Sequence, residues 1–381
     1  MAILRAAVLA QAPNAGLAAV GVLWGAFAAL VPDIKARIAA PDAAFGLAMM
    51  MSAIGGIAAM ALAPRLMARL GRFGLPVAGV LLSVAFFYPL LARDALGFGL
   101  AMVAIGASVS LLDIGANMRL SVLEDRHGLH LMNFSHAMFS FAFAASALVA
   151  SLARQAGHGP ADVLPVLSLV ALVLAAAMRE RRGWSGAAPA PDGADRRTPW
   201  GPILLCACIL LAAFVSENAT ETWSSLHIER TLGGPAGNGG FGPVAFGLTM
   251  GLGRLGGQVA AERFGEAGLV LWSAVIGVIG AVVIAAAPVP AVAVLGVGLL
   301  GLGVAVTVPS ANSILGRLVR PDQRAHAISR AWMIGFTGFF IGPTAMGAIA
   351  QTAGLRTAFL TVALIMAAIV PLVVALNRRG G

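Results

Sequence analysis

Long apolar runs, separated by short segments that carry nearly all of the charge, constrain this chain more than any other feature of its sequence. Hydrophobic residues occupy 59% of its 381 positions and charged residues only 11%, whereas soluble domains average about 25% charged residues. A chain with so few charges belongs in a lipid bilayer. The runs lack the alternating polarity of an outer-membrane barrel. We therefore predict an all-α membrane protein.

A membrane-crossing helix needs roughly 20 apolar residues, and twelve stretches of the chain meet that requirement. Residues 179–199 separate the sixth stretch from the seventh and are rich in proline, glycine and charge, as is typical of a flexible linker. The sequence thus predicts two six-helix bundles, residues 1–178 and 200–381. The predicted spans are 12–32, 44–63, 74–92, 96–120, 132–154, 162–178, 200–226, 241–261, 268–287, 290–316, 327–352 and 355–376.

Basic residues are unevenly distributed between the two sides of such a membrane. If the N-terminus is cytoplasmic, 19 arginines fall on the cytoplasmic side and six basic residues on the other side. Because basic residues favour cytoplasmic loops, we predict a multi-pass protein of the bacterial inner membrane with both termini and the linker in the cytoplasm. The net charge of +9 is spread over short loops rather than gathered on one basic face, so we predict no nucleic-acid partner.

The two halves repeat each other's motifs. "IGAN" at 114–117 corresponds to "PSAN" at 309–312, and "SHAMF" at 135–139 corresponds to "SRAWM" at 329–333. Pseudo-symmetric repeats that enclose a central site are typical of secondary transporters. The fold class that we predict is therefore twelve transmembrane helices in two pseudo-symmetric six-helix bundles.

Two six-span halves, a basic central linker and a characteristic loop resemble the major facilitator superfamily. The family signature G-x-x-x-D-R-x-G-R corresponds here to residues 64–72, where proline and alanine replace the glycine and the aspartate. In the second half, Glu262 and Arg263 keep the acid–base pair. The resemblance implies a gating role for charges at the inner ends of the helices, namely Arg69, Arg119, Glu262, Arg263 and Arg330.

A narrower resemblance comes from "WGAFAALVPDIKARI" (24–38), "LLDIGANMRLSVLEDRHGLHLMNFSHAMFS" (111–140), "SENATETWS" (216–224) and "GLGVAVTVPSANS" (301–313). Together they are similar to a poorly characterised group of bacterial inner-membrane transporters, distantly similar to the fucose–proton symporters. This resemblance implies that helices one, four, seven and ten line a substrate cavity.

Ionisable residues inside predicted spans are candidates for proton coupling, because a charged side chain in the hydrocarbon costs roughly 2.5–3.5 kcal/mol or more. Asp113 and Asn117 lie four residues apart on one helical face, and His136 opens the next span. An acid and an imidazole that meet across this helix pair could exchange protons. The alternative is a structural Asp–Asn–His network that holds the two helices together.

The seventh span carries a second pair of acids, Glu217 and Glu221, also four residues apart. We predict a cavity or coupling role for both, although Glu221 falls near the rim, where it could be a solvated acid. Tryptophan rings that could stack on a planar or sugar-like ligand, together with amides and a hydroxyl, are the predicted substrate-binding residues: Trp24, Asn117, Asn218, Trp223, Ser310 and Asn312.

These residues predict a secondary active transporter, not an enzyme, that moves a small polar, sugar-like solute by alternating access with proton coupling. The alternative is a proton-driven exporter of drugs or metabolites, which the methionine-rich stretch 47–62 favours. A third class, a membrane sensor or assembly protein, would carry no flux. The sequence contains no metal-ligand cluster and no catalytic-triad spacing, so we predict no cofactor. The expected partners are the solute, protons and the lipid bilayer, around a monomer.

Overall fold

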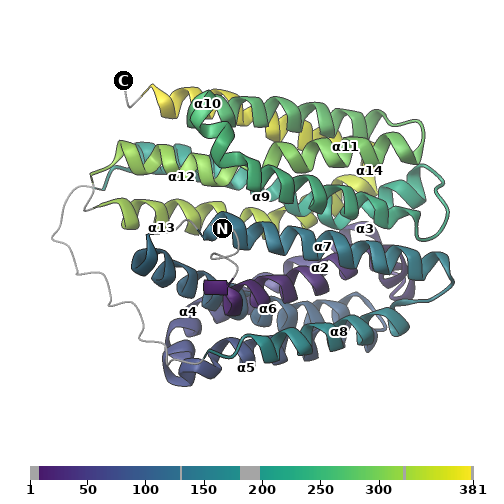
Figure 1. Ribbon diagram of the computed structural model, residues 1–381. Helices are drawn as coiled ribbons and strands as arrows, with labels where there is room; N and C mark the ends of the chain where they lie inside the picture. The colour runs from purple at the N-terminus through teal and green to yellow at the C-terminus, as the bar shows by residue number, and fades with distance from the viewer. Residues whose placement is uncertain (1–7, 129–130, 181–197, 321–322, 379–381) are drawn as a thin grey trace.

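The computed structural model describes residues 8–128, 131–180, 198–320 and 323–378. Within these ranges the chain is helical and contains no strand, so the all-α prediction is confirmed (Figure 1). The predicted linker at 179–199 lies almost wholly outside the described residues. The first and last described residues, 8 and 378, lie toward one end, here called the terminal end. The opposite, distal end carries the turns 38–41, 156–159, 232–237 and 287–289.

The helices follow the apolar runs closely. The N-terminal part of the chain contains α2 (Gln11–Arg37), α3 (Asp42–Met50), α4 (Ser52–Leu70), α5 (Gly74–Ala85), α6 (Ala95–His127), α7 (Met132–Gln155) and α8 (Pro160–Ala177), with the short 3₁₀ helices η1 (Gly71–Phe73) and η2 (Tyr88–Leu90). The C-terminal part contains α9 (Trp200–Leu226), the π-helix η3 (His227–Thr231), the 3₁₀ helix η4 (Asn238–Gly240), α10 (Phe241–Ala286), α11 (Pro290–Val304), α12 (Thr307–Leu318), α13 (Arg324–Gly335) and α14 (Gly338–Asn377).

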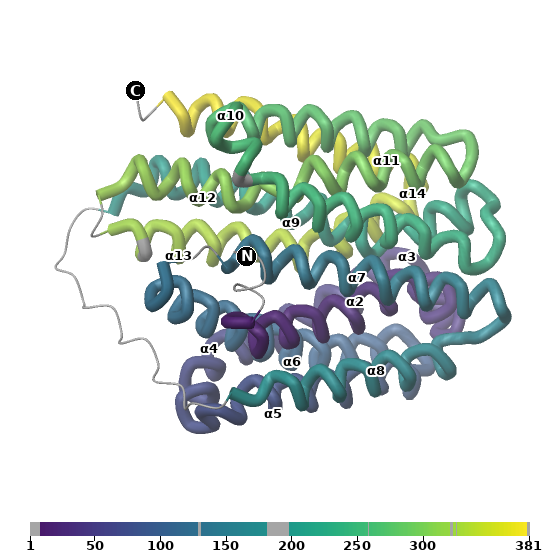
Figure 2. The backbone as a smooth tube through the Cα atoms, in the orientation of Figure 1, coloured from purple at the N-terminus to yellow at the C-terminus, as the bar shows by residue number. Residues whose placement is uncertain are grey.

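Nine helical segments among the described residues are long and apolar enough to cross a membrane. Two of them, Asp42–Leu90 and His326–Asn377, have 49 and 52 residues, more than twice what one crossing needs. Helices α10 and α14 are each interrupted by a non-helical glycine, Gly265 with φ 68° and Gly354 with φ 82°. Residues with a side chain rarely adopt such angles, so these glycines let the chain bend sharply (Figure 2).

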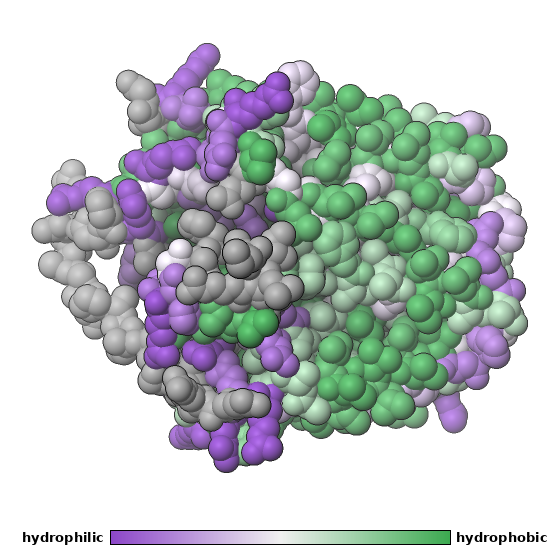
Figure 3. Space-filling model, in the orientation of Figure 1, coloured by the Kyte–Doolittle hydropathy of each residue, from purple (hydrophilic) through white to green (hydrophobic). Residues whose placement is uncertain are grey.

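The outer surface is suited to lipid. On the face drawn in Figure 3, a broad apolar belt lies between two polar ends. Large apolar side chains such as Leu100, Val173 and Leu364 are 59%, 65% and 71% exposed. In water such a surface would be a strong aggregation hazard. In a bilayer it contacts the acyl chains, which accounts for the low charge content of the sequence.

The N-terminal and C-terminal helices pack against each other mainly where α7 meets α10, where α3 meets α14 and where α2 meets α9. At the α3–α14 contact, a methyl group on Gly46 would overlap the carbonyl oxygen of Pro343, and one on Gly347 would overlap that of Asp42. Small residues allow membrane helices to approach this closely. The α2, α7, α9 and α10 contacts place the buried polar residues described below between the two parts of the chain.

Close packing of α4 on α6 gives a stability prediction. A methyl group on Gly55 would overlap the carbonyl oxygen of Val103 and lie 2.7 Å from the nitrogen of Ala107. We expect Gly55→Ala to destabilise the protein by ~1–3 kcal/mol and to lower the midpoint of thermal unfolding in detergent. Gly256→Ala is the control, because nothing lies within 4 Å of its added methyl group. Equal midpoints for the two variants would contradict this close contact.

Candidate functional site

The polar residues of α9 are buried inside the bundle. Glu217 is 6% exposed, Asn218 is 5% exposed and Glu221 is 3% exposed. Burying an ionised carboxylate without a partner is costly, so each acid should be paired in the fold. The sequence interpretation of Glu221 as a possible solvated acid at the rim is wrong, because its side chain is enclosed.

Glu221 meets its partner across the two parts of the chain. The indole Nε1 of Trp24, on α2, donates a hydrogen bond to Oε2 of Glu221 at 3.1 Å. The Trp24 ring is held in place by stacking on Phe27, with ring centroids 5.3 Å apart, and by an edge contact with Phe86. The sequence placed Trp24 and Glu221 in the same cavity, but it did not predict that they bond to each other.

Glu217 is paired with Arg254, which is the residue that sequence reasoning missed. The guanidinium Nη2 lies 3.4 Å from Oε1 of Glu217. Its Nη1 donates to Oγ of Ser140 at 2.8 Å and to the carbonyl oxygen of His136 at 3.2 Å. We counted Arg254 among the cytoplasmic charges, and that placement is wrong: its side chain is only 15% exposed. The signal was present, because Arg254 falls inside the predicted span 241–261.

The α6–α7 pair completes the polar cluster. His136 Nε2 lies 3.1 Å from Oδ1 of Asn117, so the imidazole meets the amide and not the carboxylate of Asp113 as the sequence suggested. Asp113 interacts with Asn117 one turn along α6 and lies within electrostatic range of Arg254. We call Asp113, Glu217, Glu221 and Arg254 the central charge cluster. Among the described residues its ion pair joins Glu217 of α9 to Arg254 of α10, and Asp113 of α6 and Glu221 of α9 lie within electrostatic range of that arginine.

The other predicted substrate residues are divided between the site and the core. Trp223 is fully buried, and its ring packs edge-on against Phe45 of α3 with centroids 5.8 Å apart. Asn218 accepts a hydrogen bond from Thr222 on its own helix. On α12, Ser310 is 3% exposed, and the Oδ1 atom of Asn312 is buried without a hydrogen-bond partner in the part of the chain that the structure describes.

The predicted gating residues lie at the terminal end and do not form one cluster. Arg119 pairs with Glu180, just after α8. Arg330 donates to Oγ1 of Thr198 at 2.6 Å and lies over the ring of Trp200, 5.1 Å from its centroid. The side chains of three other predicted gating residues are exposed: Arg69, Glu262 and Arg263.

A charge network at the distal end joins the two parts of the chain, and we did not predict it. Arg154, at the last turn of α7, is bonded to both Asp33 of α2 and Glu229 of η3, and only 2% of its side chain is exposed. Glu229 also accepts hydrogen bonds from the backbone of Gly237 and Gly239 at 3.0 Å. The sequence treated Arg154 as a loop charge, because its partners lie far away along the chain.

Comparison with known proteins accounts for this architecture. The sequence pattern of the Major Facilitator Superfamily matches residues 205–380. An uncharacterized MFS-type transporter of Yersinia pestis is 28% identical over 350 residues, which cover 91% of this chain and 90% of that protein. Residues 205–380 thus match this superfamily, and the Yersinia pestis relative, an MFS-type transporter, is matched over most of both chains. The comparisons indicate a multi-pass membrane transporter that is not an enzyme, as the sequence analysis predicted.

Solved structures share the fold of this chain. A point mutant of the nucleoside transporter NupG superposes with a TM-score of 0.77 over 97% of this transporter and 99% of that chain, at 13% identity. A bacterial homologue of the lysosomal transporter Spinster, inward-facing and unoccupied, gives a TM-score of 0.71 over 98% and 97%, at 11% identity. Among the relatives found by sequence, the membrane protein MosC of Rhizobium meliloti is 24% identical over 348 residues, which cover 89% of this chain and 83% of that protein.

Proposed function

We propose that this transporter is a proton-coupled secondary active transporter of a small polar, sugar-like solute, which it moves by alternating access between two halves. The observation that carries the proposal is the position of Arg254. It belongs to α10, yet it bonds at once to Glu217 of α9 and to Ser140 of α7, across the interface between the two parts of the chain. Its bonds must therefore change if the halves move relative to each other.

The proposed halves are six-helix bundles, residues 1–178 and 200–381, joined by the linker 179–199. Twelve spans result when Asp42–Leu90 is divided at Gly71, His326–Asn377 is divided at Gly354, and the two parts of α10 on either side of Gly265 are counted separately. The bend points coincide with predicted span boundaries. Broken helices near a central site, as between α11 and α12, are also usual in secondary transporters. We propose that the unit is a monomer.

We propose that the terminal end faces the cytoplasm of a bacterial inner membrane. The bias of basic residues supports this orientation even after the two buried arginines are removed. Taking Arg254 from one side and Arg154 from the other leaves 19 − 1 = 18 basic residues against 6 − 1 = 5. Because basic residues favour cytoplasmic loops, the distal end is then the periplasmic side.

Charge balance in the central charge cluster supports proton coupling. Three carboxylates around one arginine would leave two uncompensated negative charges in a low-dielectric interior, which is costly. A cluster that carries protons on some of its acids avoids this cost, and Glu217 and Glu221 lie one turn apart on α9. Proton transfer to Glu217 frees Arg254 to turn toward Asp113. This change of partner alters which helices are joined by bonds to Arg254. Proton movement is thereby coupled to the motion of the halves.

The proposed solute binds beside this cluster. Trp24 presents part of its ring and Asn312 presents a buried carbonyl oxygen without a partner among the described residues. Amide groups bind hydroxyl groups, and an indole ring stacks on the apolar face of a sugar. The likeness of the fold to NupG, a nucleoside transporter, makes nucleosides a second class of sugar-containing solute to test. Asn117 and Asn218 complete the proposed solute-binding residues, with Trp223 and Ser310 supporting them from the core.

Uptake into proteoliposomes tests the proposal directly. We expect an inward proton gradient to drive accumulation of a sugar or a nucleoside, because about one pH unit is worth ~1.4 kcal/mol per proton, or about tenfold accumulation. Asp113→Asn should abolish accumulation while downhill flux of the solute continues. The control is Asp125→Asn on the exposed end of the same helix. Accumulation retained in Asp113→Asn would remove Asp113 from the coupling site, and flux of lipophilic cations alone would favour the exporter.

A further inference from the structure

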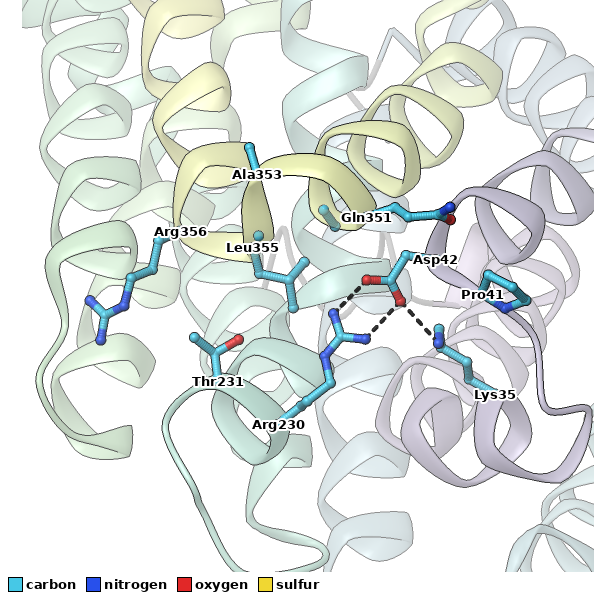
Figure 4. A pocket seen from close by; sticks show the side chains of 11 residues that line it. Lys35, Pro41, Asp42, Arg230, Thr231, Gln351, Ala353, Leu355 and Arg356 are labelled. Carbon is cyan, nitrogen blue, oxygen red and sulfur yellow. Dashed lines mark hydrogen bonds and ion pairs between the residues drawn. The ribbon is translucent and has the colours of Figure 1, made fainter.

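A second polar cavity lies at the distal end, apart from the central charge cluster. Its volume is about 670 Å³, and it lies between the end of α2, the start of α3, η3 and the bend of α14 around Gly354 (Figure 4). Arg230, in its wall, follows Glu221 by nine residues, which is ~13 Å along a helix. The cavity is lined from both parts of the chain, by Lys35 and Asp42 on one side and by Arg230 on the other.

The cavity carries an excess of positive charge. Asp42 is its one acidic residue, against Lys35, Arg230 and Arg356. The two carboxylate oxygens of Asp42 accept hydrogen bonds from Arg230 at 2.7 Å each, and Lys35 Nζ lies 2.9 Å from Oδ1. A single carboxylate that balances two cations leaves a surplus of one, and Arg356 brings the surplus to two. The guanidinium of Arg356 is held by the carbonyl oxygens of Ala285 and Ala287.

Hydrogen-bond donors in the cavity also exceed the acceptors. An arginine has five N–H groups and Asp42 takes two of those on Arg230, whose side chain stays 43% exposed. The Oε1 atom of Gln351 accepts from the backbone nitrogen of Ala43 at 2.9 Å, which orients its NH₂ group away from that bond. Figure 4 shows Arg230 and Lys35 converging on Asp42, with Gln351 beside them. Such a cavity lacks a second negatively charged acceptor for its remaining donors.

We propose that this cavity is a binding site for an oxyanion, a phosphate or a carboxylate group, held by Arg230, Lys35 and Gln351. Charge-assisted bonds to arginine are strong and favour planar or tetrahedral oxyanions. The cavity has room for more than the anionic group alone, so the group can belong to a free solute or to a lipid head group. Because both parts of the chain line it, an occupant would fasten the distal end in its closed arrangement. The site is independent of the proposed transport activity.

Removing the competing carboxylate tests the site by a gain of affinity. We expect inorganic phosphate to bind the full-length protein in phosphatidylcholine nanodiscs, measured by isothermal titration calorimetry. Asp42→Asn should tighten this binding about tenfold, because Arg230 then loses its carboxylate partner and Lys35 keeps only the neutral carbonyl oxygen of Ala40. Lys35→Gln should weaken binding by about the same factor, while Arg230 still holds Asp42 in place. Added salt should weaken phosphate binding to the wild type and to the Asp42→Asn variant.

The matched control is Arg37→Gln, an exposed distal arginine outside the cavity that donates to the carbonyl oxygen of Leu90. It should leave phosphate binding unchanged. Native mass spectrometry distinguishes the two sources: if phosphatidylglycerol is retained by the wild type, lost in Lys35→Gln and not displaced by phosphate, the ligand is a lipid head group. Phosphate and phosphatidylglycerol binding that are absent, or that are indifferent to both Asp42→Asn and Lys35→Gln, would overturn the proposal.

Discussion

Arg254→Gln is expected to abolish proton-driven accumulation of the solute. The substitution removes the guanidinium that faces Glu217 and leaves that acid buried without its cation. Removing one partner of a buried pair costs ~3–5 kcal/mol, so the arrangement that depends on this pair should become roughly a hundredfold to a few thousandfold less populated. Accumulation in proteoliposomes under an inward proton gradient is the measurement.

A conservative variant separates the role of Arg254 in coupling from a merely structural one. Arg254→Lys keeps the positive charge but has no planar fork to reach Glu217 and Ser140 together. It should restore downhill exchange in full and accumulation only in part. Arg317→Gln, an exposed arginine of α12, is the control and should transport as the wild type does. Full accumulation in Arg254→Gln would show that Arg254 is not needed for coupling.

Much of the fold could be predicted because it depends on local pattern. Length and hydropathy mark each apolar run, and in a bilayer such a run has to satisfy its own backbone hydrogen bonds as a helix. The predicted boundary between 261 and 268 falls at the Gly265 bend. The breaks at residues 305–306 and 336–337, within the predicted spans 290–316 and 327–352, escaped prediction. Threonine, serine and asparagine follow the first break at residues 307–313, so composition gave a signal there that our assignment of one continuous span did not use.

Helical geometry decided how well individual site residues could be predicted. Glu217 and Glu221 lie four residues apart and share a face, as predicted, and both are buried at the interface. Trp223 is two residues beyond Glu221, which turns it by about 200° away from that face. It therefore packs against Phe45 of α3. The 3.6-residue period alone was enough to separate Trp223 from the acids, and our grouping of these residues ignored it.

Pairings between distant segments could not be predicted from a single sequence. Arg154 finds Asp33 at a separation of 121 residues and Glu229 at a separation of 75 residues. The sequence shows each of these charges at the end of an apolar run, where solvent exposure is the ordinary interpretation. Only the packing of α2, α7 and η3 at the distal end turns three rim charges into one buried network. The same holds for Arg254, whose depth depends on the helices around it.

We expect Arg154→Gln to have a second large effect, because Arg154 is at the centre of the distal charge network. The substitution should open the distal end. The side chain of Arg154 is 2% exposed and holds Asp33 on α2 and Glu229 on η3. Without it, two carboxylates face each other across the interface and repel. Breaking a buried ion pair costs ~3–5 kcal/mol, and ~5.5 kcal/mol would reverse a 99:1 population. We therefore expect a large part of the population to shift to an arrangement that is open at the distal end.

Spin-label distances measure this opening. Labels at His158→Cys and Ala236→Cys, both exposed distal positions, in a protein whose Cys206 and Cys208 are replaced by serine, should report a longer distance in Arg154→Gln. Arg37→Gln, whose arginine binds only within the first half through Leu90, should keep the short distance.

Adding Glu229→Gln to Arg154→Gln removes one of the two repelling charges and should recover part of the closed population, so the two substitutions are expected to be non-additive. If Arg154→Gln kept the short distance, the network would not hold the distal end closed. A distance that lengthened equally with and without Glu229→Gln would assign the effect to lost packing instead of charge. The expected non-additivity follows from the two kinds of bond that Glu229 makes. It binds the guanidinium of Arg154, and it accepts hydrogen bonds from the backbone of Gly237 and Gly239. Only the bond to the guanidinium is lost when Arg154 is replaced.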